Sequence, residues 1–98
     1  RKPFGVAVGP DDSVYVTELG RNRVRHFDAA GMELRSWGGL GTEPGKFWEP
    51  RGIAVDPEGH VYVVDGENHR VQCFTNTGDF LHTWGGEGDR PGSLRTVA

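Results

Sequence analysis

Two short polar stretches hold most of the side chains that could do chemistry in this sequence. Each combines acidic and basic side chains over a few positions, and the members are Glu18, Arg21 and Arg23 in the first stretch and Asp65, Glu67, His69 and Arg70 in the second. A neighbouring Asp and Arg most simply join one loop to another through a charge-assisted hydrogen bond. The same side chains could instead line a recognition surface, because loops on a rigid scaffold often carry binding. We expect the structural role first, and the two roles are compatible.

The glycine-rich stretch 38–46 does not fit a nucleotide-binding loop. A Walker loop needs a glycine where Leu40 stands, and it needs a serine or threonine after Lys46, where Phe47 stands. The dinucleotide-binding pattern also fails, because Pro44 takes the place of its last glycine and no helix is predicted to follow. We interpret these glycines as residues that let a long connection turn.

Patterns for metal ligands and nucleophiles are equally thin. The four histidines show no His-x-His or other ligand spacing. Cys73 is the only cysteine, so an intramolecular disulfide is excluded, and we interpret it as a small buried hydrophobic residue. No Ser, His and Asp arrangement is evident. We therefore predict no catalytic residue, no metal ligand and no cofactor, and we expect the chain not to be an enzyme.

Composition excludes further classes. A formal net charge of −3 argues against a dedicated nucleic-acid binder, whose affinity comes from lysines and arginines that neutralise phosphates. No apolar run approaches the roughly 18 residues that span a bilayer, and no signal-peptide pattern opens the chain. We therefore expect a soluble protein without a membrane partner and leave its compartment open. The missing initiating Met leaves open whether the chain is trimmed, excised from a longer protein or designed.

The chain repeats itself almost completely. A shift of 47 residues aligns 3–49 with 50–96 without a gap and gives 19 identities, where typical composition gives about four by chance. Each copy contains a short β-branched run, a turn, a Val-Tyr-Val run, a polar loop and two further strand-like runs. No segment carries a helical apolar stripe, so we predict an all-β fold with four strands per repeat. A four-stranded unit of about 45 residues that is covered on both faces by its own copies is typical of a β-propeller blade.

The second repeat resembles the NHL repeat. Its sequence PRGIAVDPEGHVYVVDGENHRVQCF contains the hallmark Pro-x-Gly-aliphatic-Ala-Val strand and the hallmark Asp-x-x-Asn-x-Arg-Val loop. The first repeat departs from the loop pattern: it has Glu18 in place of Asp65 and Arg21 in place of Asn68, although it keeps the arginine as Arg23. The resemblance implies a β-propeller built from four-stranded antiparallel blades, with residues 1–49 as the first blade and 50–98 as the second. NHL propellers include protein-binding, RNA-binding and enzymatic modules, so function has to come from the site.

Within this fold we predict two groups of site residues. Contacts between blades are expected from Phe27, Trp37, Asp65, Arg70, Phe74 and Trp84. A recognition rim is expected from Glu18, Arg21, Arg23, Trp48, Asp65, Glu67, His69 and Arg70. Trp48 belongs to the second group because its counterpart in the other repeat is Arg95, so the fold itself does not demand an aromatic residue there.

Two blades leave two sheet faces uncovered, and we expect inward-type residues such as Val14, Val16, Val61 and Val63 on those faces. NHL-type propellers resemble six-bladed rings, so three copies of the chain would close one ring. The predicted function is a non-catalytic scaffold that assembles into this closed ring and binds a protein or other ligand through the loops of one rim. A dimer of closed halves and a fragment of a longer parent remain alternatives. The alternative functions are a propeller lyase or hydrolase with a metal in the channel, and an RNA-binding propeller, which the charge balance disfavours.

Overall fold

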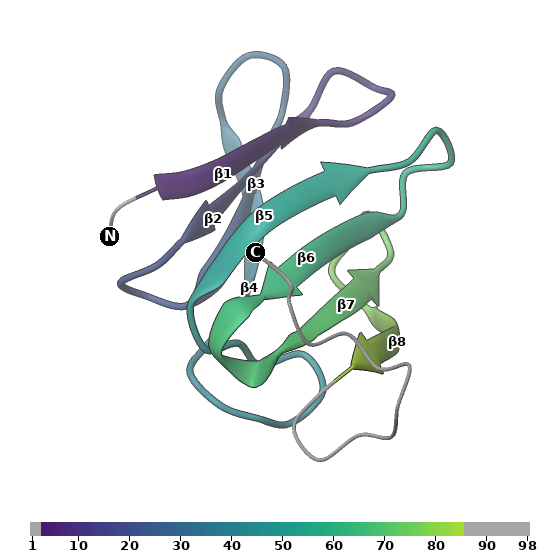
Figure 1. The fold of residues 1–98 in the computed structure, drawn as a ribbon. Coiled ribbons are helices and arrows are strands. Elements are labelled where there is room, and N and C mark those ends of the chain that lie inside the picture. Colours follow the sequence, from purple (N-terminus) through teal and green to yellow (C-terminus); the bar gives the residue numbers. More distant parts are fainter. Residues whose placement is uncertain (1–2, 86–98) are drawn as a thin grey trace.

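A computed structural model describes residues 3–85 as eight strands in two sheets (Figure 1). The first sheet contains β1 (Pro3–Val8), β2 (Val14–Glu18), β3 (Arg23–Phe27) and β4 (Glu33–Gly38), and the second contains β5 (Pro50–Val55), β6 (Val61–Asp65), β7 (Arg70–Phe74) and β8 (Phe80–Gly85). Both are antiparallel meanders in sequence order, with one 3₁₀ turn, η1 (Gly66–Asn68), between β6 and β7. The predicted all-β class with four strands per repeat is confirmed. Among the residues described, no helix is long and apolar enough to cross a membrane.

The tight turns are fixed by short polar side chains. Asp28 and Asp56 each accept hydrogen bonds from two backbone N–H groups that follow them in the chain, and Thr75 does the same through its hydroxyl. Side chains of this kind favour turns because they replace missing backbone partners. Gly31 and Gly78 close the equivalent turns of the two sheets with φ of +91° each, a conformation that favours glycine.

The duplication extends to the irregularities of the sheets. In the first sheet the pairing shifts register between Pro3 and Val6, and in the second it shifts between Pro50 and Ile53, the same repeat positions. The last strand pair of each sheet has a second shift, which also falls at equivalent positions. Such bulges bend a strand locally. Both sheets therefore have the same shape and can pack on a neighbour in the same way.

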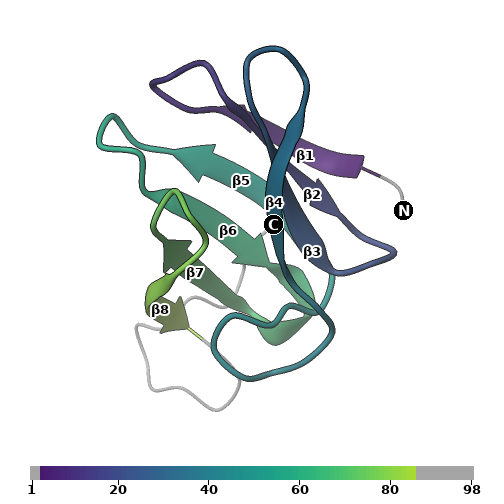
Figure 2. The same ribbon diagram turned by 180° about the vertical axis from the view of Figure 1, so that it is seen from behind.

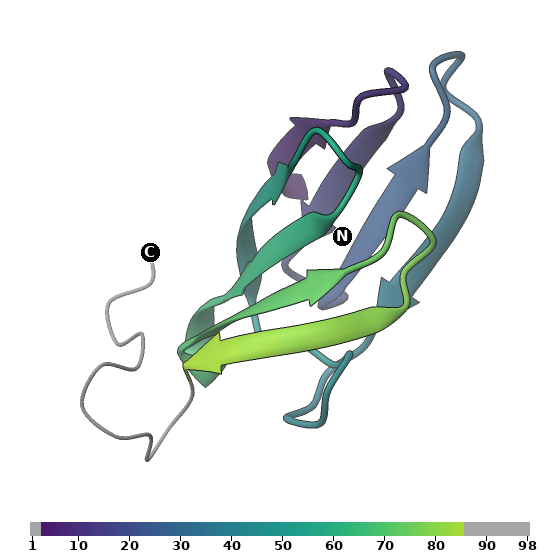
Figure 3. The same cartoon turned by 90° about the vertical axis from the view of Figure 1, so that its right-hand side faces the viewer.

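The two sheets pack face to face through one small core. Strands β1 and β5 lie side by side, whereas β4 and β8 lie on the far edges of the two sheets (Figures 1 and 2). Figure 3 shows the two sheets as adjacent layers. The buried apolar residues come from both sheets and from the connection between them, and they are Tyr15, Val24, Phe47, Val61, Val63 and Phe74.

One expectation about the faces was wrong. Val61 and Val63 are fully buried in the core between the sheets and do not lie on an outward face. Their counterparts Val14 and Val16 do lie on the side of the first sheet that faces away from the second. The reason is that side chains at equivalent repeat positions point in the same direction from both sheets, from the second sheet toward the first and from the first sheet away from the second. The first sheet therefore leaves open the face that the second sheet buries.

Candidate interaction site

Asp65, at the end of β6, is the centre of a buried polar cluster. Its Oδ2 accepts hydrogen bonds from Arg70 Nε at 2.8 Å, Asn68 Nδ2 at 2.9 Å and Gln72 Nε2 at 3.2 Å. Its Oδ1 accepts one from the backbone N–H of Trp48 at 2.7 Å. A fully buried carboxylate needs such partners, because an unpaired buried charge is costly.

The same cluster holds the connection between the two sheets. Arg70 donates to the backbone carbonyls of Thr42, Glu43 and Lys46 at 2.8, 3.1 and 2.9 Å. Asn68 donates to the carbonyl of Gly41, and the side chain of Gln72 bonds both the N–H of Gly45 and the carbonyl of Lys46. We call Asp65, Asn68, Arg70 and Gln72 the second-blade clamp. It attaches residues 41–48 to the second sheet.

Gln72 was not among the predicted site residues. The signal for it is a polar side chain in the middle of a strand, at the position that Arg25 occupies in the first repeat. Since Gln72 lies between the apolar residues Val71 and Cys73, a polar side chain at this place indicates a specific partner. That partner, the backbone of a connection far away in the sequence, could not be named from the pattern.

The first sheet has a related but more highly charged group at the same repeat positions, which we call the first-blade cluster: Glu18, Arg21, Arg23 and Arg25. Glu18 is buried and accepts a hydrogen bond from Arg23 Nε, and Arg25 lies 3.6 Å from its other oxygen. Burial raises the pKa of Glu18, but the hydrogen bond from Arg23 and the positive charges around the carboxylate, Arg23 and Arg25 among them, together hold the pKa below its usual value. Arg25 also pairs with Glu33 at 2.8 Å. Within residues 3–85, the side chains of Arg23 and Arg25 bond to carboxylates and not to backbone carbonyls.

The predicted rim residues divide between the ends of the two sheets. Trp48 and Glu67 meet through a backbone hydrogen bond of 3.0 Å beside the second-blade clamp, and His69 follows η1 in a left-handed conformation. Trp48 and Leu40 are 47% and 68% exposed, and together with Gly41 and Thr42 they line a surface recess. Asp65 and Arg70 are buried within the clamp and are not presented on this surface.

The predicted aromatic contacts differ between the two repeats. Trp37 of the first sheet lies 5.5 Å from the ring of Phe74 in the second, so these two residues meet across the sheets. Trp84 contacts only rings of its own sheet, Tyr62 at 6.0 Å and His82 at 4.4 Å, among the residues described. Phe27 lies beneath Arg25 at 4.9 Å.

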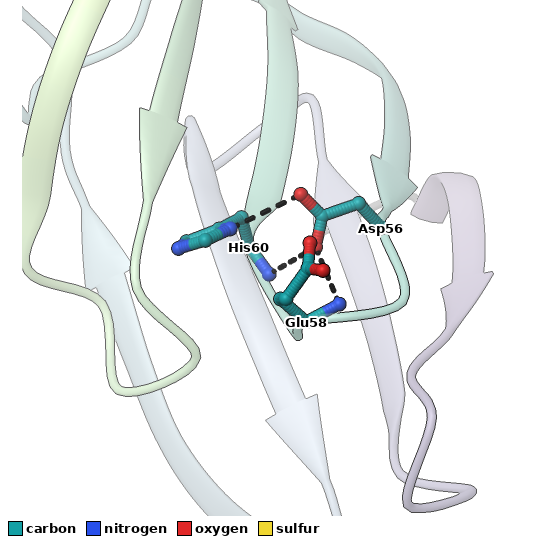
Figure 4. A group of neighbouring side chains, drawn as sticks. All are labelled: Asp56, Glu58 and His60. Carbon is teal, nitrogen blue, oxygen red and sulfur yellow. Dashed lines mark hydrogen bonds and ion pairs between the residues drawn. The ribbon is translucent and has the colours of Figure 1, made fainter.

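The turn between β5 and β6 brings three possible metal ligands together (Figure 4). Ligand atoms of Asp56, Glu58 and His60 all lie within 4.8 Å of one another. However, one oxygen of Asp56 binds two backbone N–H groups of the turn, and the other accepts from His60 Nδ1 and from the hydroxyl of Tyr62, each at 3.1 Å. The bond to Asp56 raises the pKa of Tyr62 to about 12. The carboxylate therefore serves the turn itself.

His26 and Ser13 form the other polar pair that suggests chemistry. His26 Nε2 lies 2.8 Å from Ser13 Oγ, and Ser13 donates to Asp11 Oδ1 at 2.6 Å. Arg35 bonds the other ring nitrogen, and the ring stacks on Tyr15 at 3.9 Å. The order is not that of a hydrolytic triad, because the aspartate binds the serine and not the histidine. Both His26 and Ser13 are buried, so a substrate has no access to them.

Comparison with known proteins gives one family. The family model described as NHL repeat matches residues 1–27 and 47–74, more than half of the chain. A search of curated proteins finds no match.

Solved structures with the same fold include enzymes. A streptogramin B lyase shares 22% identity, with a TM-score of 0.67 over 84% of this chain and 26% of the lyase. A catalytically inactive virginiamycin B lyase from Staphylococcus aureus with quinupristin shares 21% identity, with a TM-score of 0.68 over 92% of this chain and 27% of that one. Hydrazine synthase from Kuenenia stuttgartiensis shares 17%, with a TM-score of 0.69 over 84% and 22%. The chain thus spans about a quarter of their length, and at these identities the likeness concerns the fold alone.

Proposed function

Because the chain belongs to the NHL repeat family, we propose that it is a non-catalytic interaction module that assembles with further copies of itself through its open blade faces. One observation carries this proposal. In the second blade, Ile53, Val63 and Phe74 face the first blade and lie in or against the core. The same repeat positions in the first blade are Val6, Val16 and Phe27, and they lie on its open side, where Val6 is 66% exposed.

The second blade has the complementary open face. Tyr15, Val24 and Trp37 of the first blade pack toward the second blade. Their counterparts on the second blade are Tyr62, Val71 and Trp84, of which Trp84 is 43% exposed. A second copy could therefore place this face on the open face of the first blade, as the two blades pack within one chain. Such head-to-tail contacts must close into a ring or grow into a filament. Closure after three copies gives a six-bladed ring.

A non-catalytic role is supported by how the titratable groups of residues 3–85 are used. The buried carboxylates of Glu18 and Asp65 bind arginines, and the buried His26 is enclosed by Ser13, Tyr15 and Arg35. These groups hold loops and blades together. Cleavage of a streptogramin by the purified, assembled protein would contradict this part of the proposal.

The recess on the rim is the place where we expect a protein ligand to bind. Leu40 and Trp48 offer an exposed apolar surface, and aromatic residues of this kind are common in recognition surfaces. Their counterparts in the second repeat are Glu87 and Arg95, so the fold does not require apolar residues there. The expected partner inserts an apolar side chain between Leu40 and Trp48.

Sedimentation velocity over a range of protein concentrations tests the assembly. We expect a species of about three times the 10.8 kDa chain mass. Val6→Lys should leave a folded monomer, because a lysine on the open face cannot be buried against a second copy. Leu40→Lys, the same kind of change on the rim, should not affect assembly. A wild-type chain that stays folded and monomeric at all concentrations would refute the proposed assembly.

A further inference from the structure

We propose that the first-blade cluster is a socket for residues 86–96 of a second copy of the chain, which it holds as the second-blade clamp holds residues 39–49. This inference rests on the assembly proposed above and specifies the contact that determines its order. The cluster and the clamp occupy the same repeat positions, and residues 86–96 correspond to 39–49 by the same shift of 47.

The first step of the argument is geometric. Arg23 donates through Nε to Glu18, just as Arg70 donates through Nε to Asp65. In Arg70 this arrangement directs the two terminal amino groups to three carbonyls of the connection. In Arg23 the same amino groups donate to no carbonyl of residues 3–85, and its side chain is 28% exposed, compared with 11% for Arg70. The socket is thus preformed and suited to backbone carbonyls.

The second step is charge complementarity. In the clamp, neutral Asn68 binds the carbonyl of Gly41, which lies between the uncharged residues Leu40 and Thr42. The first-blade cluster has Arg21 in place of Asn68. Residues 86–96 correspondingly have Glu87 and Asp89 in place of Leu40 and Thr42. In the cluster, the cation Arg21 thus takes the place of an amide. In the segment proposed to bind it, two anions take the places of two uncharged residues. Matched opposite charges favour this partner over an arbitrary loop.

The same stretch also contains two basic residues. Arg90 takes the position of Glu43, whose backbone carbonyl alone binds Arg70 and whose side chain is exposed. Arg95 takes the position of Trp48, whose side chain lies on the surface recess. Glu87 and Asp89 directly flank the residue that corresponds to Gly41, whereas Arg90 and Arg95 lie further along the stretch.

The third step concerns the apolar anchor of the connection. Phe47 is fully buried and lies 5.6 Å from the ring of Phe74. The second copy offers Leu94 at the position of Phe47, and the first blade offers Phe27 at the position of Phe74. Phe27 lies on the open face, so an apolar side chain of leucine size would gain burial there.

A charge exchange tests the socket. Arg21→Asp and Asp89→Arg should each weaken assembly by about tenfold in dissociation constant, and the double variant should recover most of the loss because it restores an opposite pair. Glu58→Arg is the control, since Glu58 is exposed on the turn between β5 and β6, at the opposite ends of these strands from the clamp, and it should leave the dissociation constant within about twofold. Sedimentation equilibrium gives the constants, and circular dichroism shows that each variant is folded.

The outcomes separate this inference from the proposed function. Assembly that is unchanged by both single reversals, or is not restored by the double variant, would refute the socket and leave the blade-face assembly standing. A monomeric wild-type chain would refute both proposals together. Loss in the single variants with recovery in the double variant supports the socket.

Discussion

At Asp65, four hydrogen bonds end on one fully buried carboxylate, and one of them reaches the connection between the blades directly. The residue therefore does more than pair with Arg70. It orients the three donor side chains that hold residues 41–48 in place. The charge also offsets the guanidinium of Arg70, which is itself largely buried.

Asp65→Ala should lower the free energy of unfolding by about 3–5 kcal/mol, because it leaves the charge of Arg70 buried without its partner. The matched control is Glu67→Ala, two residues away. Glu67 is exposed and lies 3.6 Å from Arg51, so its loss should cost no more than about 0.5 kcal/mol. Urea denaturation of dilute protein measures both values. Similar losses for the two variants would contradict the role of Asp65 as the centre of the clamp.

His26 should make stability depend on pH. Burial lowers its pKa, the positive charge of Arg35 lowers it further, and Asp11 opposes this only in part. The unfolded chain therefore binds a proton at this residue at a higher pH than the folded chain does. The free energy of unfolding should be constant above the ordinary histidine pKa of about 6.5 and fall as the pH decreases below it.

The pH dependence is checked by denaturation between pH 5 and 7.5. His26→Gln should remove the decrease in this window, although it also costs stability at neutral pH. His82→Gln is the control, because His82 is exposed and should leave the decrease unchanged. Below this window, carboxyl groups with lowered pKa such as Asp11 add a loss of their own. A decrease that persists in His26→Gln would mean that another group causes it.

At the scale of elements, the last β-hairpins of the two blades, β3–β4 and β7–β8, can be compared with each other. Gly31 and Gly78 have the same φ, but their surroundings differ. A Cβ at Gly78 would lie 2.7 Å from the ring of Trp37, whereas a Cβ at Gly31 would meet nothing within 4 Å. The turn of the second blade thus packs on the first blade, and the turn of the first blade is open.

Gly31→Ala should lower the free energy of unfolding of the dilute monomer by about 1–2 kcal/mol, because alanine is strained in the left-handed backbone conformation. Gly78→Ala should cost a further 1–3 kcal/mol or so, because the same strain is joined by a clash with Trp37. Thermal or urea unfolding of the two variants measures the difference directly. Equal losses would show that the ring of Trp37 moves aside without cost.

Most of the secondary structure was predictable from the sequence. The β-branched runs and the turn residues were sufficient to predict four strands per repeat, because these signals are local. Which face of each sheet is buried was predicted only in part: Val61 and Val63 were expected on an outward face and lie in the core. Nothing in a repeated sequence says which of two equivalent faces a neighbour covers. The partners of Arg70 were hidden for a related reason, since they are backbone carbonyls and leave no trace in residue type.

At the scale of the whole molecule, Trp84 is a reporter of assembly. Its counterpart Trp37 packs between the blades, while Trp84 remains 43% exposed. In a variant with Trp37→Phe and Trp48→Phe, only Trp84 fluoresces. Its emission should shift to shorter wavelength as the concentration rises, because the ring becomes buried against a second copy. The same variant with Val6→Lys should show no shift, and a shift there would mean that the open face of the first blade is not involved.

The reach of the second-blade clamp also determines how the chain opens. Each hairpin can form from neighbouring residues, but the bonds of the clamp join positions 24–28 apart. Melting of β6 and β7 would release residues 41–48 and expose Phe47, which completes the core of the first blade as well. The two blades should therefore open as a single cooperative unit. Native-state hydrogen exchange should give the same opening free energy for amides of β2 and β6, and earlier opening of one blade would show that the two halves are energetically independent.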